Sequence, residues 1–407
     1  MSAGEHPPAT SSDPRPPAAG PGYYSDVANP TQRPNRRRLT LYGIMVVGFL
    51  LCWGVLIFEF GSGLGLRTTV LAALFAAIPL FVVVPTYLWV DRYEAEPVRF
   101  LLFGFAWGAL CAAVGALFLN TFFSLALRLA GNENADTLSA VISAPVVEEG
   151  LKGLGILLII VLRRRQFDGV IDGIVYAGMI GAGFAFSENI LYLGRIYQEY
   201  GGAGLTQLFF LRCVMGPFAH PLFTAMTGIG LGLAVSVMRT RATQVIAGLA
   251  GYLGAMILHA VWNLSASTGN IFGAYLAFQV PFFLCFLGLL AWLRLREGRT
   301  IRRYLSQYAD AGWLTPPEVA MLGSLSTRRQ ARSWARQHGG PGAVASMRSF
   351  QDSAADLALL RSRMARGAAE PDAQARERVL LEAMVAHRWG FLGTPAIGPA
   401  GVGPPAR

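Results

Sequence analysis

The sequence contains a single lysine, Lys152, and few charges of either sign. Charged residues make up 14% of the 407 residues and hydrophobic residues 53%, whereas a soluble domain carries about 25% charged residues. This composition excludes an ordinary soluble protein and favours a membrane protein. The net charge of +10 does not indicate nucleic-acid binding, because the arginines gather in the tails and at the ends of apolar segments, as membrane topology requires.

Cysteine is also scarce, and its spacing excludes two further classes of protein. The four cysteines lie far apart, each within an apolar segment, at Cys52, Cys111, Cys213 and Cys285. They form neither a zinc-binding spacing nor a disulfide framework. We expect buried, inert thiols.

Long apolar segments dominate the middle of the chain. Each is long enough to cross a hydrocarbon core that needs about 20 helical residues. We expect eight spans, near 40–62, 69–90, 99–128, 138–162, 169–194, 206–238, 243–264 and 271–294. The sequence therefore predicts an all-α, polytopic membrane helix bundle, with a disordered Pro-rich leader at 1–38, a transmembrane core at 39–295 and a basic cytoplasmic appendage at 296–407.

The arginines predict the orientation of these spans. One set of loops is rich in arginine and includes Arg163, Arg164 and Arg165, whereas the alternate loops hold only Arg67, Arg128 and Arg195. The positive-inside rule then places both termini in the cytoplasm of a multi-pass cell-membrane protein.

The appendage carries helix signals. Thr315 precedes Pro316-Pro317-Glu318, which is typical of a helix N-cap with proline in the first turn, and 348–366 and 372–389 have amphipathic spacing. We expect a small helical appendage followed by a flexible tail. A docking platform for a cytoplasmic regulator and a membrane-surface helix stay open as alternatives.

Lys152 lies in the fourth span beside two adjacent glutamates, Glu148 and Glu149. Ionisable residues inside a membrane are costly and are candidates for function. Glu148 and Lys152 are four residues apart and can pair, whereas Glu149 is turned by about 100° and is not expected to share Lys152 equally. Pro145 can kink the helix and leave polar backbone near the carboxylates. Unequal protonation of the two carboxylates suits general acid–base catalysis.

Further polar residues lie on neighbouring spans. Glu188 and Asn189 belong to the fifth, His220 to the sixth, and His259 and Asn263 share one face of the seventh. Alternative interpretations are a structural ion pair, a glutamate that snorkels to the outer interface, and histidines that only pack. Arg212 is also expected to snorkel. A cluster between the midplane and the outer leaflet can hold a water molecule against a substrate backbone.

These residues form three blocks that resemble the PrsW family of intramembrane proteases, membrane relatives of the CAAX-processing endopeptidase superfamily. The blocks are Glu148-Glu149-x-x-Lys152, Asp172-Gly173 through Glu188-Asn189, and His259-x-x-Trp262-Asn263, with His220 between the last two. The likeness covers roughly residues 70–295. It implies an intramembrane endopeptidase that cuts a membrane-anchored protein, such as an anti-sigma factor, on its outer side.

The resemblance also implies roles for the site residues. Glu148 and Glu149 would be the catalytic glutamates, one of them a general base, while Glu188, His220, His259 and Asn263 would orient water or stabilise the oxyanion. Lys152 and Asn189 would support them. We favour metal-free glutamate catalysis without a cofactor and leave zinc open, with Glu149, Glu188, His220 and His259 as its ligands.

A proton-coupled transporter or channel is the alternative function. Intramembrane carboxylates also relay protons, and Glu148, Lys152 and His259 could form such a relay. Two features count against it: the sequence shows no large internal repeat of the kind many transporters have, and the polar residues lie outward of the bilayer centre.

Overall fold

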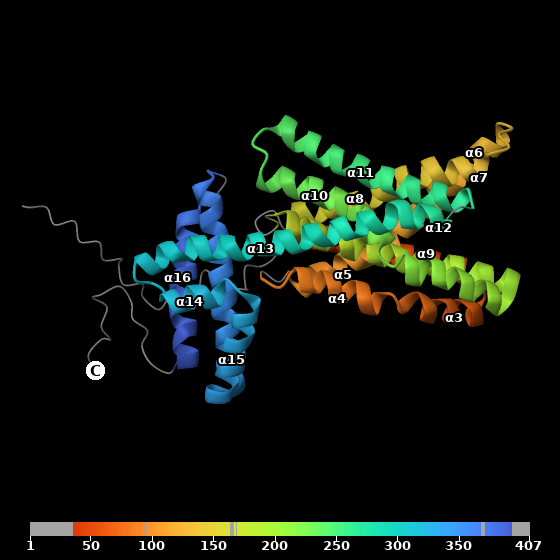
Figure 1. Cartoon of the computed structure of the whole chain (residues 1–407). Coiled ribbons are helices and arrows are strands. Elements are labelled where there is room, and N and C mark those ends of the chain that lie inside the picture. The colour runs from red at the N-terminus through yellow and green to blue at the C-terminus, as the bar shows by residue number, and fades with distance from the viewer. Residues whose placement is uncertain are drawn as a thin grey trace, which may run out of the picture. The chain divides into compact units, whose positions relative to one another are not determined.

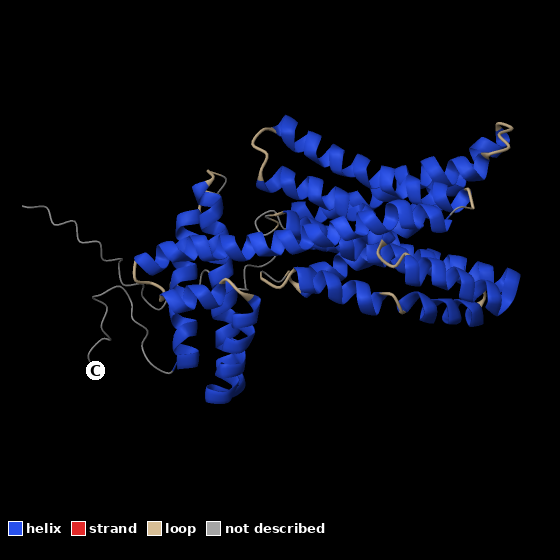
Figure 2. Ribbon diagram, in the orientation of Figure 1, coloured by secondary structure: helices blue, strands red, loops and turns tan. Residues whose placement is uncertain are grey.

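A computed structural model describes residues 36–93, 96–162, 167, 169–269, 271–367 and 371–392. Within these ranges the chain is helical and has no strand (Figure 2). The predicted all-α bundle is therefore confirmed. Residues 1–35 of the predicted leader and the run Arg163 to Arg165 lie outside the described residues, whereas residues 36–38, which we expected to be disordered, already belong to the first described helix. The chain divides into two units, residues 1–48 and 49–407, and the polar residues predicted from the sequence all belong to the second.

Six stretches of the described chain are long and apolar enough to cross a membrane. They are Gly43–Gly63, Leu66–Val90, Val98–Leu129, Val170–Ser236, Arg241–Ser267 and Ile271–Asp310. Val170–Ser236 has 67 residues, far more than one crossing needs. Helix α8 (Ala144–Leu162) is absent from this set and carries three charged residues among its 19. The chain is thus a multi-pass membrane protein, and the number of eight spans stays a prediction.

The first three predicted spans correspond to helices with local interruptions. They comprise α2 (Arg36–Gly63), then α3 (Leu66–Ala77) and α4 (Leu80–Val90), then α5 (Val98–Ala106), the π-helical turn η1 (Trp107–Ala112) and α6 (Ala113–Leu129). Pro79 lies between α3 and α4 and has no N–H to donate to the preceding turn. The fourth span likewise starts with α7 (Ala135–Leu138) and the π-helical turn η2 (Ser139–Ser143), which lead into α8.

Helix α9 (Val170–Phe209) forms the centre of the bundle, and residues 172–184 are all buried. Its glycines allow close backbone contacts. A Cβ atom at Gly183 would lie 2.0 Å from the carbonyl oxygen of Phe105, and one at Gly181 would lie 2.7 Å from Pro221 Cα. At the start of the helix, the Asp172 carboxylate accepts the N–H of Gly169 at 3.1 Å, so Asp172 caps α9.

The boundary predicted between the fifth and sixth spans coincides with a kink. Two helical stretches meet at Gly201 (φ 65°) inside α9, and the residues on either side run antiparallel, with Gly173 against Gly228 and Gly181 against Pro221. The π-helical turn η3 (Phe210–Met215) and α10 (Ala219–Ser236) follow α9. A further interruption, which was not predicted, lies at 216–218, where Pro217 restricts Gly216 and cannot donate a backbone hydrogen bond. Helices α10 and α11 (Arg241–Ser267) then form an antiparallel hairpin (Figure 1).

The last predicted span does not end near residue 294. After α12 (Ile271–Ala274) and the π-helical turn η4 (Tyr275–Gln279), α13 continues from Val280 to Asp310. Three more helices follow, α14 (Pro316–Leu322), α15 (Leu325–Ala365) and α16 (Ala373–Leu392). The predicted cap is confirmed, because the Thr315 hydroxyl accepts the N–H of Glu318 while the Glu318 carboxylate accepts that of Thr315. These helices share an apolar core that includes Leu305, Phe350 and Leu357.

Candidate active site

Three ionisable residues of α8 are buried inside the bundle. The exposed fractions are 5% for Glu148 and 0% for both Glu149 and Lys152. The Lys152 ammonium lies 2.8 Å from Glu149 Oε1 and 3.5 Å from Glu148 Oε2. Our expectation that Glu148 would be the preferred partner is therefore wrong. Residues three apart on a helix are also neighbours, and the long lysine side chain turns toward the carboxylate held by other donors.

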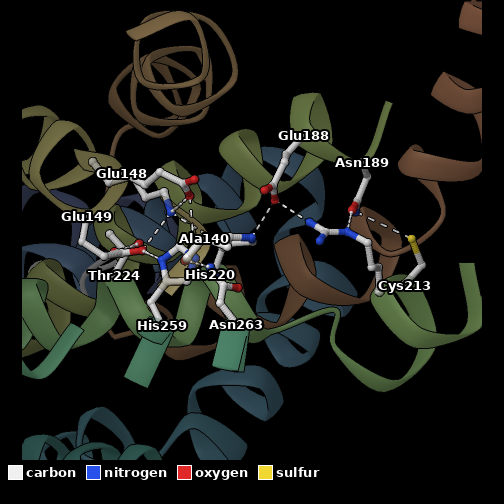
Figure 3. A network of polar contacts seen from close by, with 12 residues as sticks. Ala140, Glu148, Glu149, Glu188, Asn189, Cys213, His220, Thr224, His259 and Asn263 are labelled. Carbon is white, nitrogen blue, oxygen red and sulfur yellow. Dashed lines mark hydrogen bonds and ion pairs between the residues drawn. The ribbon is translucent and has the colours of Figure 1, made fainter. Parts of the chain in front are cut away.

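Glu149 has all of its hydrogen-bonding capacity directed at protein groups. Its Oε2 accepts the hydroxyl proton of Thr224 at 2.9 Å, and its Oε1 lies 3.0 Å from His259 Nδ1 (Figure 3). A carboxylate accepts hydrogen bonds only, so His259 carries its proton on Nδ1. In the neutral imidazole with this tautomer, Nε2 is an acceptor with a free lone pair. Glu149 thus fixes the orientation and tautomer of this imidazole.

Glu148 is bonded differently. Its Oε1 accepts the Asn120 side-chain amide at 3.3 Å, whereas its buried Oε2 has no hydrogen-bond partner. That oxygen lies 3.8 Å from His259 Nε2. Two acceptors that face each other across a short gap require a shared donor or a cation between them. The gap between Glu148 Oε2 and His259 Nε2 is therefore a candidate position for a water molecule or a cation.

His220 links this cluster to Glu188. The Lys152 ammonium lies 3.1 Å from His220 Nδ1, and since an ammonium only donates, the His220 proton lies on Nε2. That nitrogen is 2.7 Å from Glu188 Oε2. The rings of His220 and His259 are 5.1 Å apart, nearly perpendicular. Glu188, Glu148 and both histidines thus meet in one polar network, as the sequence predicted.

Arg212 holds the far end of the network. It binds the Glu188 carboxylate and donates from Nε to Asn189 Oδ1 at 2.8 Å, and Asn189 in turn donates to Cys213 Sγ at 3.6 Å. The Glu188 and Arg212 side chains are only 15% and 18% exposed. The snorkelling interpretations of Glu188 and Arg212 are therefore wrong, because each charge satisfies the other inside the bundle.

Asn263 contacts backbone in a neighbouring span. Its side-chain amide donates to the carbonyl of Ala140 at 2.7 Å. Ala140 lies in η2, a π-helical turn in which each carbonyl accepts the N–H of the residue five positions later. For the Ala140 carbonyl that residue is Pro145, which has no N–H. Asn263 therefore replaces the donor that Pro145 cannot supply. The sequence predicted the exposed backbone, but not that Asn263 would satisfy it.

Two polar residues of the network, Asn120 and Thr224, escaped our candidate set, as did the clamping role of Arg212. Asn120 is the only amide side chain in the span near 99–128, which was a usable signal. Thr224 follows His220 by four residues and so shares its helix face.

A cavity of about 200 Å³ opens beside the carboxylates. It is lined by Asn120 and Thr121 of α6, by Glu148 of α8, and by Ser187 and Glu188 of α9. The same cavity is also lined by apolar side chains, including Leu117 and Phe184. A peptide bond or water molecule can find hydrogen-bond partners at its polar side chains.

One group of metal-ligating side chains occurs among the described residues. Ligand atoms of Glu148, His220 and His259, all buried, lie within 4.8 Å of one another. The unpartnered Oε2 of Glu148 and the free lone pair of His259 Nε2 suit a cation such as zinc, and the Glu149–His259 hydrogen bond has the geometry of a carboxylate that supports a metal-bound histidine. Glu148 replaces Glu149 and Glu188 of the expected ligand set.

Known proteins with similar sequences agree with this arrangement. Residues 96–289 match a family described as "PrsW family intramembrane metalloprotease". Protease PrsW of Geobacillus kaustophilus (strain HTA426) is 28% identical over 214 residues, 53% of this chain and 84% of the relative. Protease PrsW of Oceanobacillus iheyensis is 26% identical over 227 residues, 56% of this chain and 96% of the relative.

A shorter match is to Protease PrsW of Bacillus subtilis (strain 168), 32% identical over 144 residues, which are 35% of this chain and 60% of the relative. No solved structure matches the chain. The family match covers the buried glutamates, both intramembrane histidines and Asn263. With these residues on separate spans of a multi-pass bundle, residues 96–289 are similar to the PrsW family of intramembrane proteases.

Proposed function

We propose that this chain hydrolyses a peptide bond of a membrane-anchored protein with a water molecule held between Glu148 and His259. The observation that carries the proposal is Glu148 Oε2, which has no hydrogen-bond partner and lies 3.5 Å from the Lys152 ammonium and 3.8 Å from His259 Nε2, beside the cavity. A water molecule has two hydrogens and can donate to both acceptors. Its lone pairs are then free to attack a carbonyl carbon.

In this mechanism Glu148 is the general base. It takes one proton from the water as the oxygen attacks the scissile carbonyl, and it returns that proton to the nitrogen when the C–N bond breaks. Glu149 keeps His259 in the accepting tautomer through the 3.0 Å contact with Nδ1. The Lys152 ammonium offsets the charge of the glutamate pair, and Asn120 holds Glu148 Oε1.

A metal ion would be held by Glu148, His220 and His259, and would supply a Lewis acid that polarises water or the scissile carbonyl. We favour glutamate catalysis without a metal because the Lys152 ammonium already lies 3.5 Å from Glu148 Oε2 and 3.1 Å from His220 Nδ1. A divalent cation at those ligands would be repelled by this ammonium.

The depth of the site supports cleavage in the outer half of the bilayer. Glu148 lies 14 residues before Leu162, the last residue of α8, which corresponds to about 21 Å of helix in a hydrocarbon core about 30 Å thick. The arginine pattern places Leu162 at the cytoplasmic side, and both termini there as well. We propose a cell-membrane location and a single-span substrate such as an anti-sigma factor, with a cytoplasmic regulator on the appendage.

The test compares membrane proteomes of cells that contain the wild-type protein or Glu148→Gln. We expect ectodomains to be released only with the wild-type protein, and a purified, reconstituted enzyme to cleave the same substrates. Equal release with both proteins would contradict the proposal.

A further inference from the structure

The cavity beside Glu148 has one wall that differs from the rest. Helices α6, α8 and α9 contribute both polar and apolar side chains to the lining, among them Asn120, Glu148 and Glu188, whereas α2 contributes only the apolar side chains of Leu56 and Phe60. A substrate peptide bond must enter this cavity to reach the unpartnered oxygen of Glu148. The α2 wall stands between the cavity and the apolar outer face of the bundle.

Helix α2 contacts the bundle through a narrow stripe. Phe49, Cys52, Leu56 and Phe60 recur every three or four residues, so they share one helix face, and Leu56 is the sole buried residue among the described side chains of α2. On the opposite face Phe58 is 73% exposed. Lipid is as apolar as these side chains, so the hydrophobic effect does not hold α2 against the bundle within a membrane. This wall can therefore separate more easily than the buried α9.

The end of α2 is anchored to α9. Gln198 donates to the carbonyl of Leu64 at 2.9 Å, and Leu64 fills the space above Gly194, where a Cβ atom would lie 2.5 Å from it. Gly65 follows with φ +75°, a conformation that glycine adopts without strain. Further along α2, the thiols of Cys52 and Cys111 interact across the seam with η1. The geometry is that of a wall hinged near Gly65.

We propose that the membrane-spanning helix of the substrate reaches Glu148 from the lipid through the seam between α2 and α6, and that α2 swings aside to admit it. This inference rests on the proposed function. A larger groove of about 890 Å³ between α8, α10 and α11 is the competing route. That groove reaches Glu149, whose oxygens are already bonded by Thr224, Lys152 and His259, and not the free oxygen of Glu148.

Photo-crosslinking tests the route without requiring catalysis. In a Glu148→Gln background, p-benzoylphenylalanine replaces Leu117, which lines the cavity from α6, or, as the matched control, Leu249, which lines the other groove from α11. The probe is a tagged single-span protein identified by the membrane-proteome comparison. We expect at least about tenfold more adduct from Leu117 than from Leu249. Equal yields, a higher yield from Leu249 or no adduct at either position would overturn the route.

A second experiment locks the seam. Copper phenanthroline and oxygen oxidise the Cys52 and Cys111 thiols to a disulfide, and Cys111→Ala treated identically is the control. We expect the locked protein to lose at least tenfold in cleavage of the single-span probe, to keep its cleavage of a short soluble peptide around the same bond, and to recover on reduction. Unchanged cleavage of the single-span probe after locking, or an equal loss for both probes, would refute the gate. If the proposed function itself is wrong, the Glu148→Gln variant will cleave the probe as fast as the wild-type protein, and this result is distinct from a failure of the gate.

Discussion

Substituting each glutamate of the pair by glutamine separates catalysis from stability. Glu148→Gln removes the base but leaves Lys152 paired with Glu149 at 2.8 Å, and the oxygen it alters has no hydrogen bond to lose. A positioned general base contributes about 10²–10⁴-fold in rate, so we expect the cleavage rate to fall about 10³-fold, or about 4 kcal/mol in activation free energy. The thermal unfolding temperature should stay close to that of the wild-type protein.

Glu149→Gln is expected to lower stability as well as activity. It leaves the fully buried Lys152 ammonium without its closest carboxylate and weakens the hydrogen bond that orients His259. Removing one partner of a buried ion pair costs about 3–5 kcal/mol of stability. We therefore expect a large drop in the unfolding temperature together with a loss of activity.

The assay measures both variants in the same detergent, with unfolding followed by tryptophan fluorescence and cleavage followed on the single-span probe. The reasoning is refuted if Glu148→Gln unfolds at a lower temperature than Glu149→Gln, or if Glu148→Gln retains more than a tenth of the wild-type rate. In the first case the roles of the two carboxylates would be exchanged. In the second, neither the base nor the water site would be at Glu148.

Three further predictions concern other parts of the protein. Asn263→Leu leaves the carbonyl of Ala140 without its donor and should lower the free energy of unfolding by about 1–3 kcal/mol, measured by thermal denaturation, whereas Asn263→Asp, which cannot donate, should be as harmful. Burial, with smaller contributions from the Glu96 and Glu297 carboxylates, raises the pKa of Asp91 to about 8. The stabilising contribution of protonated Asp91 is therefore present at low pH and is lost as the pH rises toward 8. Asp91→Asn should remove about 2 kcal/mol of the stability difference between pH 6 and pH 8, and parallel curves of stability against pH for both proteins would contradict this. Dialysis against 1,10-phenanthroline should leave the cleavage rate within about twofold; a loss that zinc restores would instead place a metal at the three-ligand group.

Much of the fold could be predicted from local sequence patterns, because helix formation and helix capping depend on residues that are close together in the chain. Apolar runs of sufficient length must be helical in lipid, so the spans near 40–62 and 243–264 match α2 and α11 within a few residues. The Thr315 cap likewise depends on residues three apart. The kink at Gly201 lies in the loop expected between 194 and 206, because glycine adopts a positive φ without strain, whereas the interruption at 216–218 within the sixth predicted span was missed.

The sequence alone determined which residues are candidates for the chemistry, since charges buried in apolar spans must be paired or used, and their order along the chain resembles that of the PrsW family. It did not determine their partners. Tertiary packing brought Thr224 and His259 against Glu149, left one oxygen of Glu148 unbonded, and placed Asn263 against a carbonyl that Pro145 leaves open. Hydrogen bonds between spans depend on how the helices rotate and tilt against one another, and the spacing of residues within one helix carries no record of that rotation.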